Sequence, residues 1–284
     1  MQEIQNKKEF QDSDDQIDLK ELFFVIIQGK KLILLFTAFL SIIGITYSLL
    51  LPNVYESKAL LSPVESSSNN ISGALGNFSG LAGLAGIDLF SGNEGSNSKK
   101  AIETIGSLSF FEKNIMPKIF LPDLMAIKTW KNETNSIIYD DNIFDINSDT
   151  WVRDFSFPNK LVPSAQESFE VFIDDHLNIS EDVETGFITL SIKHQSPYLA
   201  KQWVDLIVKE INTFYRQKDK SDSEKAVVYL NDQMAMTRLS EMTKVIAELL
   251  QQEIQKLTLI EAKEAYVFDY IYPPSVMEKN SEPR

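Results

Sequence analysis

The chain has 284 residues and a formal net charge of −14, from 41 acidic and 27 basic residues. This length allows one sizeable domain plus a membrane segment, or two small domains. Nucleic-acid binders carry basic stripes that displace counterions from phosphates, so the acidic balance argues against a nucleic-acid partner. The sequence has no cysteine, which excludes thiol catalysis, disulfide bonds and zinc ribbons.

An uncharged stretch near the N-terminus predicts a transmembrane helix over residues 32–51. The stretch reads LILLFTAFLSIIGITYSLLL, and about 20 helical residues cross the hydrocarbon core of a bilayer. A buried helix of a soluble protein and a cleaved signal peptide are the alternatives. The preceding arm over 1–31 and the length of the apolar stretch favour an uncleaved anchor.

Basic residues lie close to this stretch on one side only. Lys30 and Lys31 directly precede it, whereas Lys58 is the first basic residue after it. The positive-inside rule therefore places the arm 1–31 in the cytoplasm and the rest of the chain outside it. Apolar residues between 17 and 27 predict either a short helix at the cytoplasmic membrane surface or an extension of the membrane helix.

The exported part, over 52–272, begins with an expected strand at 54–61. A Gly/Ser-rich loop is expected over 64–98, because seven of the eleven glycines lie between residues 73 and 95. Its LAG repeat lacks the Lys-Ser or Lys-Thr of a Walker loop, so we expect a close-packed small-residue segment there.

The middle of the exported part predicts short elements. Ser164 starts a helix with Glu167 three residues on, as in a capping box. Apolar residues on both sides of the turn EDVETG predict two strands. The expected elements are a helix over 101–120 that Pro117 interrupts or ends, loops and short helices over 122–163, a helix over 164–177, and strands over 177–179 and 187–192.

The C-terminal third predicts long helices. Ser196 caps a helix whose first position is Pro197, where the missing N–H costs nothing. After a charged stretch, residues from about 224 to 265 contain no Gly or Pro, which predicts one long helix of about 60 Å. Such an amphipathic helix needs a partner face in its own chain or on a neighbouring subunit. The strand AYVFDYIY and a Pro-containing tail over 273–284 follow.

The sequence shows no catalytic constellation. It lacks G-x-S-x-G, H-E-x-x-H and a G-x-G-x-x-G after a strand. His176 is expected at a helix end and His194 at a strand end, and neither has a second histidine at metal-ligand spacing. We therefore assign no catalytic, cofactor-binding or metal-binding residue and expect no cofactor. An enzyme acting on glycan, with two carboxylates that meet only in the fold, stays an alternative.

Several stretches stand in a distinctive order along the chain. They are IDLKELFFVIIQGKKLILL before the span, LPNVYESKALLSP after it, the small-residue SGLAGLAGI, GFITLSIKHQSPYLAKQWVDLIVKEIN, and a C-terminal AYVFDYIYPP with the tail EKNSEPR. Together, over about residues 17–284, they resemble the bacterial polysaccharide chain-length determinant family, also called polysaccharide co-polymerases. The stretch that begins GFITLSIKH is the most specific part of this resemblance.

The resemblance implies an α+β fold, in which an N-terminal transmembrane helix precedes a periplasmic α/β base domain with long projecting helices. It implies a bacterial inner-membrane protein with a cytoplasmic N-terminus and a periplasmic main domain. Such proteins form ring-like homo-oligomers and work with a membrane polysaccharide polymerase on a lipid-linked glycan. Family members usually have a second membrane helix, toward which the tail 273–284 would lead, and we expect either a truncation or a natural single-span form.

The function that the resemblance implies is regulation of the chain length of a surface polysaccharide by an oligomeric membrane scaffold that is not itself an enzyme. Lipopolysaccharide O-antigen is the preferred polysaccharide. One alternative is a capsule or exopolysaccharide co-polymerase that works with a separate tyrosine kinase. Another is a periplasmic adaptor of an export system, which would carry a helical hairpin flanked by two halves of a lipoyl-like β domain.

Overall fold

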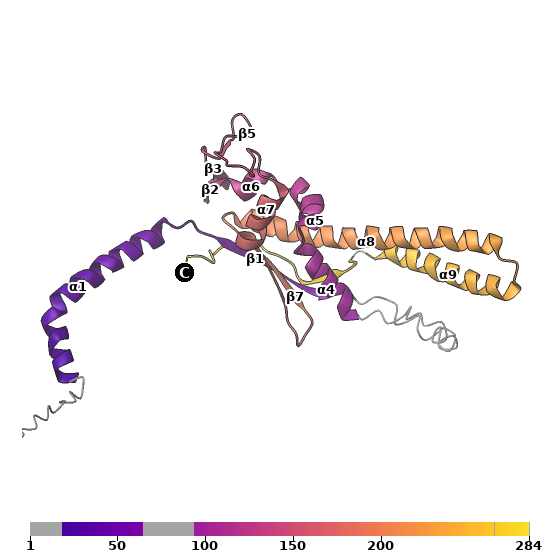
Figure 1. Cartoon of the computed structure of the whole chain (residues 1–284), viewed down its shortest axis with the longest axis horizontal. Helices are drawn as coiled ribbons and strands as arrows, with labels where there is room; N and C mark the ends of the chain where they lie inside the picture. Colours follow the sequence, from indigo (N-terminus) through magenta and orange to yellow (C-terminus); the bar gives the residue numbers. More distant parts are fainter. Residues whose placement is uncertain (1–18, 65–93, 264, 284) are drawn as a thin grey trace, which may run out of the picture. The chain divides into compact units, whose positions relative to one another are not determined.

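The structure contains two compact units, which are described separately. The computed structural model describes residues 19–64, 94–263 and 265–283. Its units are Met1–Leu51 and Pro52–Arg284, and Figure 1 draws the whole chain. In the first unit the described residues form helix α1 (Leu19–Leu50).

Helix α1 contains a segment long and apolar enough to cross a membrane. The segment is Gly29–Tyr47, and none of it is buried. At 1.5 Å per residue it spans about 28 Å, close to the thickness of a bilayer core. The Thr37 hydroxyl donates to the Ile33 carbonyl at 2.9 Å, which satisfies a polar group inside the apolar segment. Since α1 is continuous from Leu19, the residues before Gly29 extend the same helix.

The second unit is built on a four-stranded sheet of order β6-β7-β1-β8, in which each neighbouring pair is antiparallel. The register places Ala59 of β1 opposite Leu190 of β7. All four strands agree with the expectations from the sequence, and the α+β class is confirmed. The strands are β1 (Tyr55–Pro63), β6 (Leu177–Glu181), β7 (Ile188–His194) and β8 (Phe268–Tyr272).

Two long helices, α8 (Pro197–Met236) and α9 (Ser240–Ala262), follow β7 and return the chain to β8. The expected single helix over 224–265 is therefore wrong, because α8 continues from Pro197 through the charged stretch and the chain reverses after Met236. Thr237 has an extended backbone, with ψ 123°. Neither Gly nor Pro marks this reversal. It follows from tertiary structure, since β8 must come back to pair with β1 at the other end of the helices.

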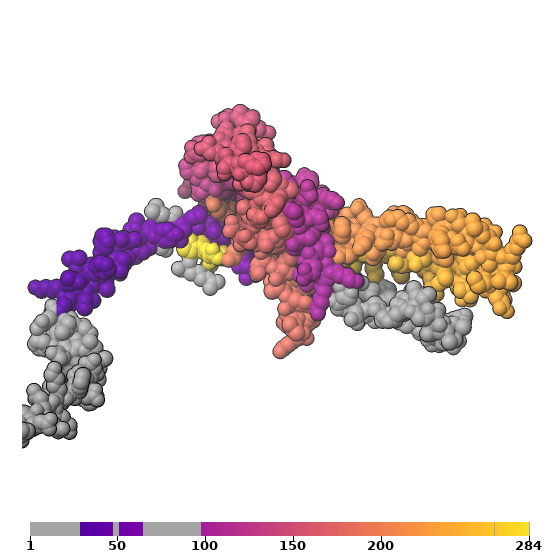
Figure 2. Space-filling model, in the orientation of Figure 1, coloured from indigo at the N-terminus to yellow at the C-terminus, as the bar shows by residue number. Residues whose placement is uncertain are grey.

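The two helices form an arm that extends from the sheet (Figures 1 and 2). Polar contacts join them near the sheet. Lys220 of α8 pairs with Glu261 of α9, and the Arg216 guanidinium donates to the Lys263 carbonyl at 2.7 Å. Helix α8 therefore supplies part of the partner face that the sequence predicts for the long helix, while apolar side chains of α9 such as Met242 and Val245 stay exposed.

The core lies between the sheet and the first half of α8. Ala59, Leu190 and Ile192 of the sheet are fully buried, as are Val204 and Ile207 of α8. Burial of such side chains contributes about 1.5–3 kcal/mol each for the larger ones. The helix therefore covers one face of the sheet and holds the base of the arm rigid.

Short elements surround this core. They include two β-hairpins, which the sequence did not predict, because loops and short helices were expected over 122–163. They are α4 (Glu94–Ile105), α5 (Leu108–Phe110), η1 (Phe111–Ile115), η2 (Met116–Lys118), α6 (Leu121–Met125), the hairpins β2 (Ile127–Lys131) with β3 (Ser136–Tyr139) and β4 (Phe144–Asp145) with β5 (Thr150–Trp151), α7 (Ala165–Val171) and η3 (Phe172–His176).

Two further expectations need correction. The helix over 101–120 is broken, because α4 ends at Ile105 and the Ser107 hydroxyl caps α5 by accepting from the Phe110 N–H at 3.3 Å. The end of the predicted loop over 64–98 is helical, since α4 begins at Glu94. The rest of that loop, including the LAG repeat, lies outside the described residues.

Candidate functional site

The structure brings the two histidines of the sequence together. His176 ends η3 and His194 ends β7, and their ring centroids are 5.5 Å apart. The register of β6 and β7 pairs Leu177 with Ile192, so the residue before β6 faces the end of β7. Trp203 of α8 packs edge-on against both rings, at 4.9 Å from His194 and 5.5 Å from His176.

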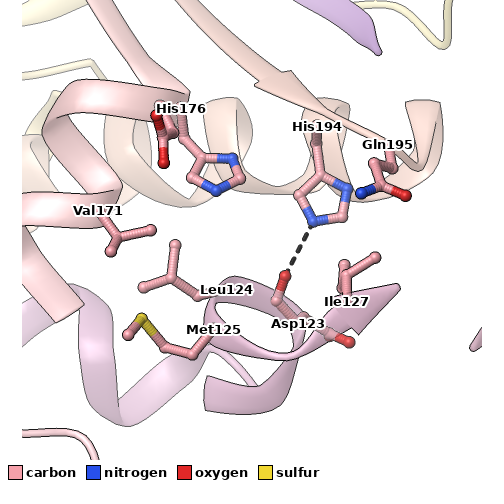
Figure 3. Close-up of a pocket in the computed structure, with 9 residues that line it drawn as sticks. Asp123, Leu124, Met125, Ile127, Val171, His176, His194 and Gln195 are labelled. Carbon is pink, nitrogen blue, oxygen red and sulfur yellow. Dashed lines mark hydrogen bonds between the residues drawn. The ribbon is translucent and has the colours of Figure 1, made fainter. Parts of the chain in front are cut away.

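His194 joins three segments through its two ring nitrogens. Nδ1 accepts a hydrogen bond from the Ser196 N–H at 2.9 Å, and Nε2–H donates to the Asp123 carbonyl at 3.1 Å, as Figure 3 shows. Only the neutral ring can accept at one nitrogen and donate at the other. Burial, together with a smaller repulsion from His176, lowers the pKa of His194 to about 4. His194 therefore stays neutral at physiological pH.

His176 is held in a similar way. Its Nδ1–H donates to the Lys193 carbonyl at 2.6 Å, which fixes the orientation of the ring. Burial lowers the pKa of His176 as well. Both rings are therefore fixed in orientation by backbone groups.

Asp123 extends the joint to the neighbouring hairpin. Its side chain accepts a hydrogen bond from the Tyr139 hydroxyl of β3 at 2.6 Å, while its carbonyl binds His194. Burial raises the pKa of the Asp123 carboxyl, although the bond from Tyr139 opposes this. The joint thus connects the end of β7, the start of α8 and the β2–β3 hairpin.

A cavity of about 250 Å³ lies beside the histidines. Leu124, Met125 and Val171 contribute apolar walls, and Gln195 lies at its edge (Figure 3). In the part of the chain that the structure describes, no group of three or more His, Cys, Asp or Glu side chains could hold a metal ion. The arrangement is suited to a structural joint, because both ring nitrogens of His194 are already bonded to backbone groups.

The sequence places both histidines at element ends, which is confirmed, but it does not pair them. They are eighteen positions apart, with a hairpin turn between them. The register across that hairpin is what brings the rings together. The extended character of 187–192 and the turn EDVETG are the signals that could have indicated the pairing.

Residues 15–115 match the model of the family Wzz, chain length determinant protein. No curated protein matches the sequence. A fragment of WzzB, a polysaccharide co-polymerase from Salmonella Typhimurium, is 10% identical with a TM-score of 0.38, over 81% of this chain and 100% of that chain. A full-length bacterial polysaccharide co-polymerase is 11% identical with a TM-score of 0.35, over 94% of this chain and 90% of that one.

The Shigella flexneri lipopolysaccharide O-antigen chain-length regulator WzzB, as a mutant, is 10% identical with a TM-score of 0.27, over 80% of this chain and 99% of that chain. Because all three TM-scores lie below 0.5, the assignment depends on the family match, which includes α1, β1 and α4. The resemblance expected from the sequence is confirmed over residues 15–115, which match the model of the Wzz family of chain length determinant proteins.

Proposed function

We propose that this protein regulates the chain length of a surface polysaccharide, with lipopolysaccharide O-antigen as the first candidate, and is not itself an enzyme. The observation that carries the proposal is the family match over residues 15–115. That segment connects the candidate membrane helix to the central strand β1 of the sheet. The mechanism we infer is a scaffold, whose surface holds a polymerase or a growing lipid-linked glycan for a time that decides the glycan length.

We place the protein in the bacterial inner membrane, with a cytoplasmic N-terminus and a periplasmic second unit. Two features support this topology. The Gly29–Tyr47 segment is long and apolar enough to span a bilayer. Lys30 and Lys31 lie at its N-terminal end, whereas Lys58 is the first basic residue after Leu51, as the positive-inside rule requires for this orientation.

We infer that the protein acts as a ring-like homo-oligomer. The arm supports self-association, because it exposes large apolar side chains on both helices and residues 216–263 contain eight basic and eight acidic residues. Two copies of this balanced arm would approach without the repulsion expected from the −14 charge of the whole chain. The exposed apolar side chains of the arm include Val228, Tyr229, Met236, Leu239, Met242, Val245, Leu249, Ile254 and Leu259.

The α8–α9 hairpin is the one observation that favours a second function, a periplasmic adaptor of an export system. Adaptors carry such a hairpin between two halves of a lipoyl-like β domain. Here the flanking strands β7 and β8 lie on either side of β1 in one open antiparallel sheet, and the family match is to chain length determinants. These two observations favour the chain-length role.

Deletion of the gene in its host, with gel profiling of the surface polysaccharides, tests the proposal. The modal band of lipopolysaccharide should disappear while polymer of random length is still made, and a plasmid copy of the gene should restore the band. A change confined to capsule or exopolysaccharide would point to the alternative pathway. Loss of all polymer, or an unchanged profile, would contradict the chain-length role.

A further inference from the structure

A second cavity, of about 240 Å³, lies where four distant segments of the second unit meet. They are the start of β1, the β2–β3 hairpin, the first turn of α8 and the C-terminal tail. Three aromatic rings dominate its wall, with a thioether and two polar side chains beside them. The residues are Tyr55, Trp130, Tyr198, Met277, Asn132 and Glu278.

The aromatic wall is preorganised. The rings of Tyr55 and Trp130 meet edge to face, with centroids 5.4 Å apart and planes at 80°. The indole N–H of Trp130 donates to the Asn135 side-chain oxygen at 3.0 Å, and Asn135 occupies the turn with a positive φ of 46°. A ligand that stacks on this wall would meet rings already fixed in place, which lowers the entropic cost of binding.

The tail that forms the opposite wall is fixed on both sides of Met277. The buried Ser57 hydroxyl of β1 donates to the Ser275 carbonyl at 2.8 Å. Farther along, the Ser281 N–H donates to the Val54 carbonyl at 2.7 Å. The cavity is therefore a built feature of the fold, held by bonds between β1 and the tail.

Polar groups at the cavity remain available to a ligand. Among the residues that the structure describes, the side chains of Asn132, Tyr198 and Glu278 have no hydrogen-bond partner. Asn132 offers an amide, Tyr198 a hydroxyl and Glu278 a carboxylate. Tyr198 is 50% exposed, so its ring is open to a molecule that arrives from solvent.

Aromatic faces next to hydrogen-bonding groups match the chemistry of a sugar ring, whose C–H groups stack on an aromatic face while its hydroxyls bond at the edge. The volume is below the ~300–1,000 Å³ of sites for drug-sized ligands, which fits one ring. Glu278 is the charged residue in the lining, so an acidic sugar would be repelled. We infer that this cavity binds one neutral sugar ring of the glycan, an inference that rests on the proposed function.

Saturation-transfer NMR on the detergent-solubilised full chain tests the inference, with N-acetylglucosamine, galactose and glucuronic acid as probes. A neutral sugar should receive magnetisation from the aromatic protons, and glucuronic acid should not. Trp130→Ala and Tyr198→Ala should weaken neutral-sugar binding about tenfold. Phe157→Ala removes an aromatic ring that is 95% exposed and outside both the cavity lining and the arm, so it should leave binding unchanged.

Circular dichroism on each variant establishes that it is folded. Tyr198 lies on α8 and is exposed, so Tyr198→Ala leaves the packing of the β2–β3 hairpin intact. The inference is overturned if no neutral sugar binds the wild-type chain. It is also overturned if both cavity variants bind like the wild type. If only the detergent head groups receive magnetisation from the aromatic protons, the aromatic cluster is a membrane-interface contact. This result would likewise overturn the inference.

Complementation of the deletion strain separates this inference from the proposed function. If Tyr198→Ala shifts the modal length while Phe157→Ala restores the wild-type length, the cavity acts in length control. If Tyr198→Ala restores the wild-type profile that the deletion lost, the cavity has no such role, although the chain-length function itself stands. A deletion without any effect on length would instead remove the proposed function.

Discussion

His194 shows how one residue can hold several segments together. Its neutral ring accepts from the N-terminal cap residue of α8 and donates to α6, while Trp203 packs against it. A protonated ring could not accept from the Ser196 N–H, so the fold favours the neutral form. This preference links the stability of the second unit to pH.

The direction of the pH effect follows from the pKa. The ordinary pKa of 6.5 applies to His194 in the unfolded chain, and burial lowers the value to about 4 in the folded one. Between these values the unfolded chain binds a proton that the folded chain does not. The free energy of unfolding should therefore fall as pH drops from 6.5 to 4, by up to about 3 kcal/mol. The full contribution of neutral His194 to stability should be present above pH 6.5.

Urea unfolding at pH 7, 6, 5 and 4.5, followed by tryptophan fluorescence, measures this dependence. His194→Gln should unfold more easily at pH 7, by about 1–3 kcal/mol, because the Ser196 N–H and the Asp123 carbonyl are left poorly satisfied. Its stability should nevertheless change less with pH than that of the wild type. An equal pH slope in both proteins would show that His194 is not the titrating group.

At the scale of elements, Asn212 of α8 fastens the start of β8. Its side-chain oxygen accepts from the N–H groups of Val267 at 2.7 Å and Phe268 at 3.0 Å, and its Nδ2 donates to the Phe268 carbonyl at 2.9 Å. These bonds close the loop made by the arm, because they tie its returning end to the base of α8.

Asn212→Ala should lower the free energy of unfolding by about 2–3 kcal/mol, since it leaves backbone groups without partners. Asn231→Ala is the matched control, because Asn231 is exposed on the same helix. Thermal unfolding by circular dichroism compares the two variants. Equal midpoints would contradict the role of Asn212 in fastening β8.

Arg153 orders the loop that leads to α7. Its guanidinium forms a forked ion pair with Glu167 and donates to the carbonyls of Leu161 at 3.0 Å and Lys160 at 2.6 Å. The pair with Arg153 holds the pKa of Glu167 below its usual range. The Arg153 side chain thus supplies hydrogen bonds to loop carbonyls that have no strand partner.

Arg153→Gln should loosen this loop and speed chymotryptic cleavage at the exposed Phe155 about tenfold, because the fork and one carbonyl bond are lost. Lys160→Ala keeps the carbonyl that Arg153 binds and should be cleaved like the wild type. Cleavage is followed by gel electrophoresis and mass spectrometry. Equal rates in the wild type and in Arg153→Gln would show that Arg153 does not restrain the loop.

At the scale of the whole molecule, the absence of cysteine makes the proposed topology easy to test. Val183→Cys introduces a thiol in the β6–β7 turn, at a side chain that is 96% exposed. Gln5→Cys introduces one in the N-terminal arm. A membrane-impermeant maleimide added to cells with a permeabilised outer membrane should label Val183→Cys and spare Gln5→Cys.

Both thiols should react once the inner membrane is also disrupted, which shows that each is accessible. Labelling of Gln5→Cys in cells with an intact inner membrane would reverse the orientation, and protection of Val183→Cys would place the second unit in the cytoplasm. Either result would remove the periplasmic topology on which the proposed function depends.

Local signals in the sequence were enough for much of this structure. The Ser164 and Ser196 caps, the turn before β7, the four sheet strands and the α1 helix all depend on residues that are close in sequence. Capping, alternation and an uncharged apolar run have their physical cause within one element. Family resemblance added the chain-length role, which the match over residues 15–115 supports.

Tertiary structure decided what distant contacts control. No Gly or Pro lies in the turn after Met236, so local sequence does not predict the reversal there. The chain turns back because β8 pairs with β1. The pairing of His176 with His194 depends on strand register, and the sugar-sized cavity needs four segments that meet only in the folded unit. Sequence by itself determined which elements form, whereas only the packing of those elements determined which side chains share a site.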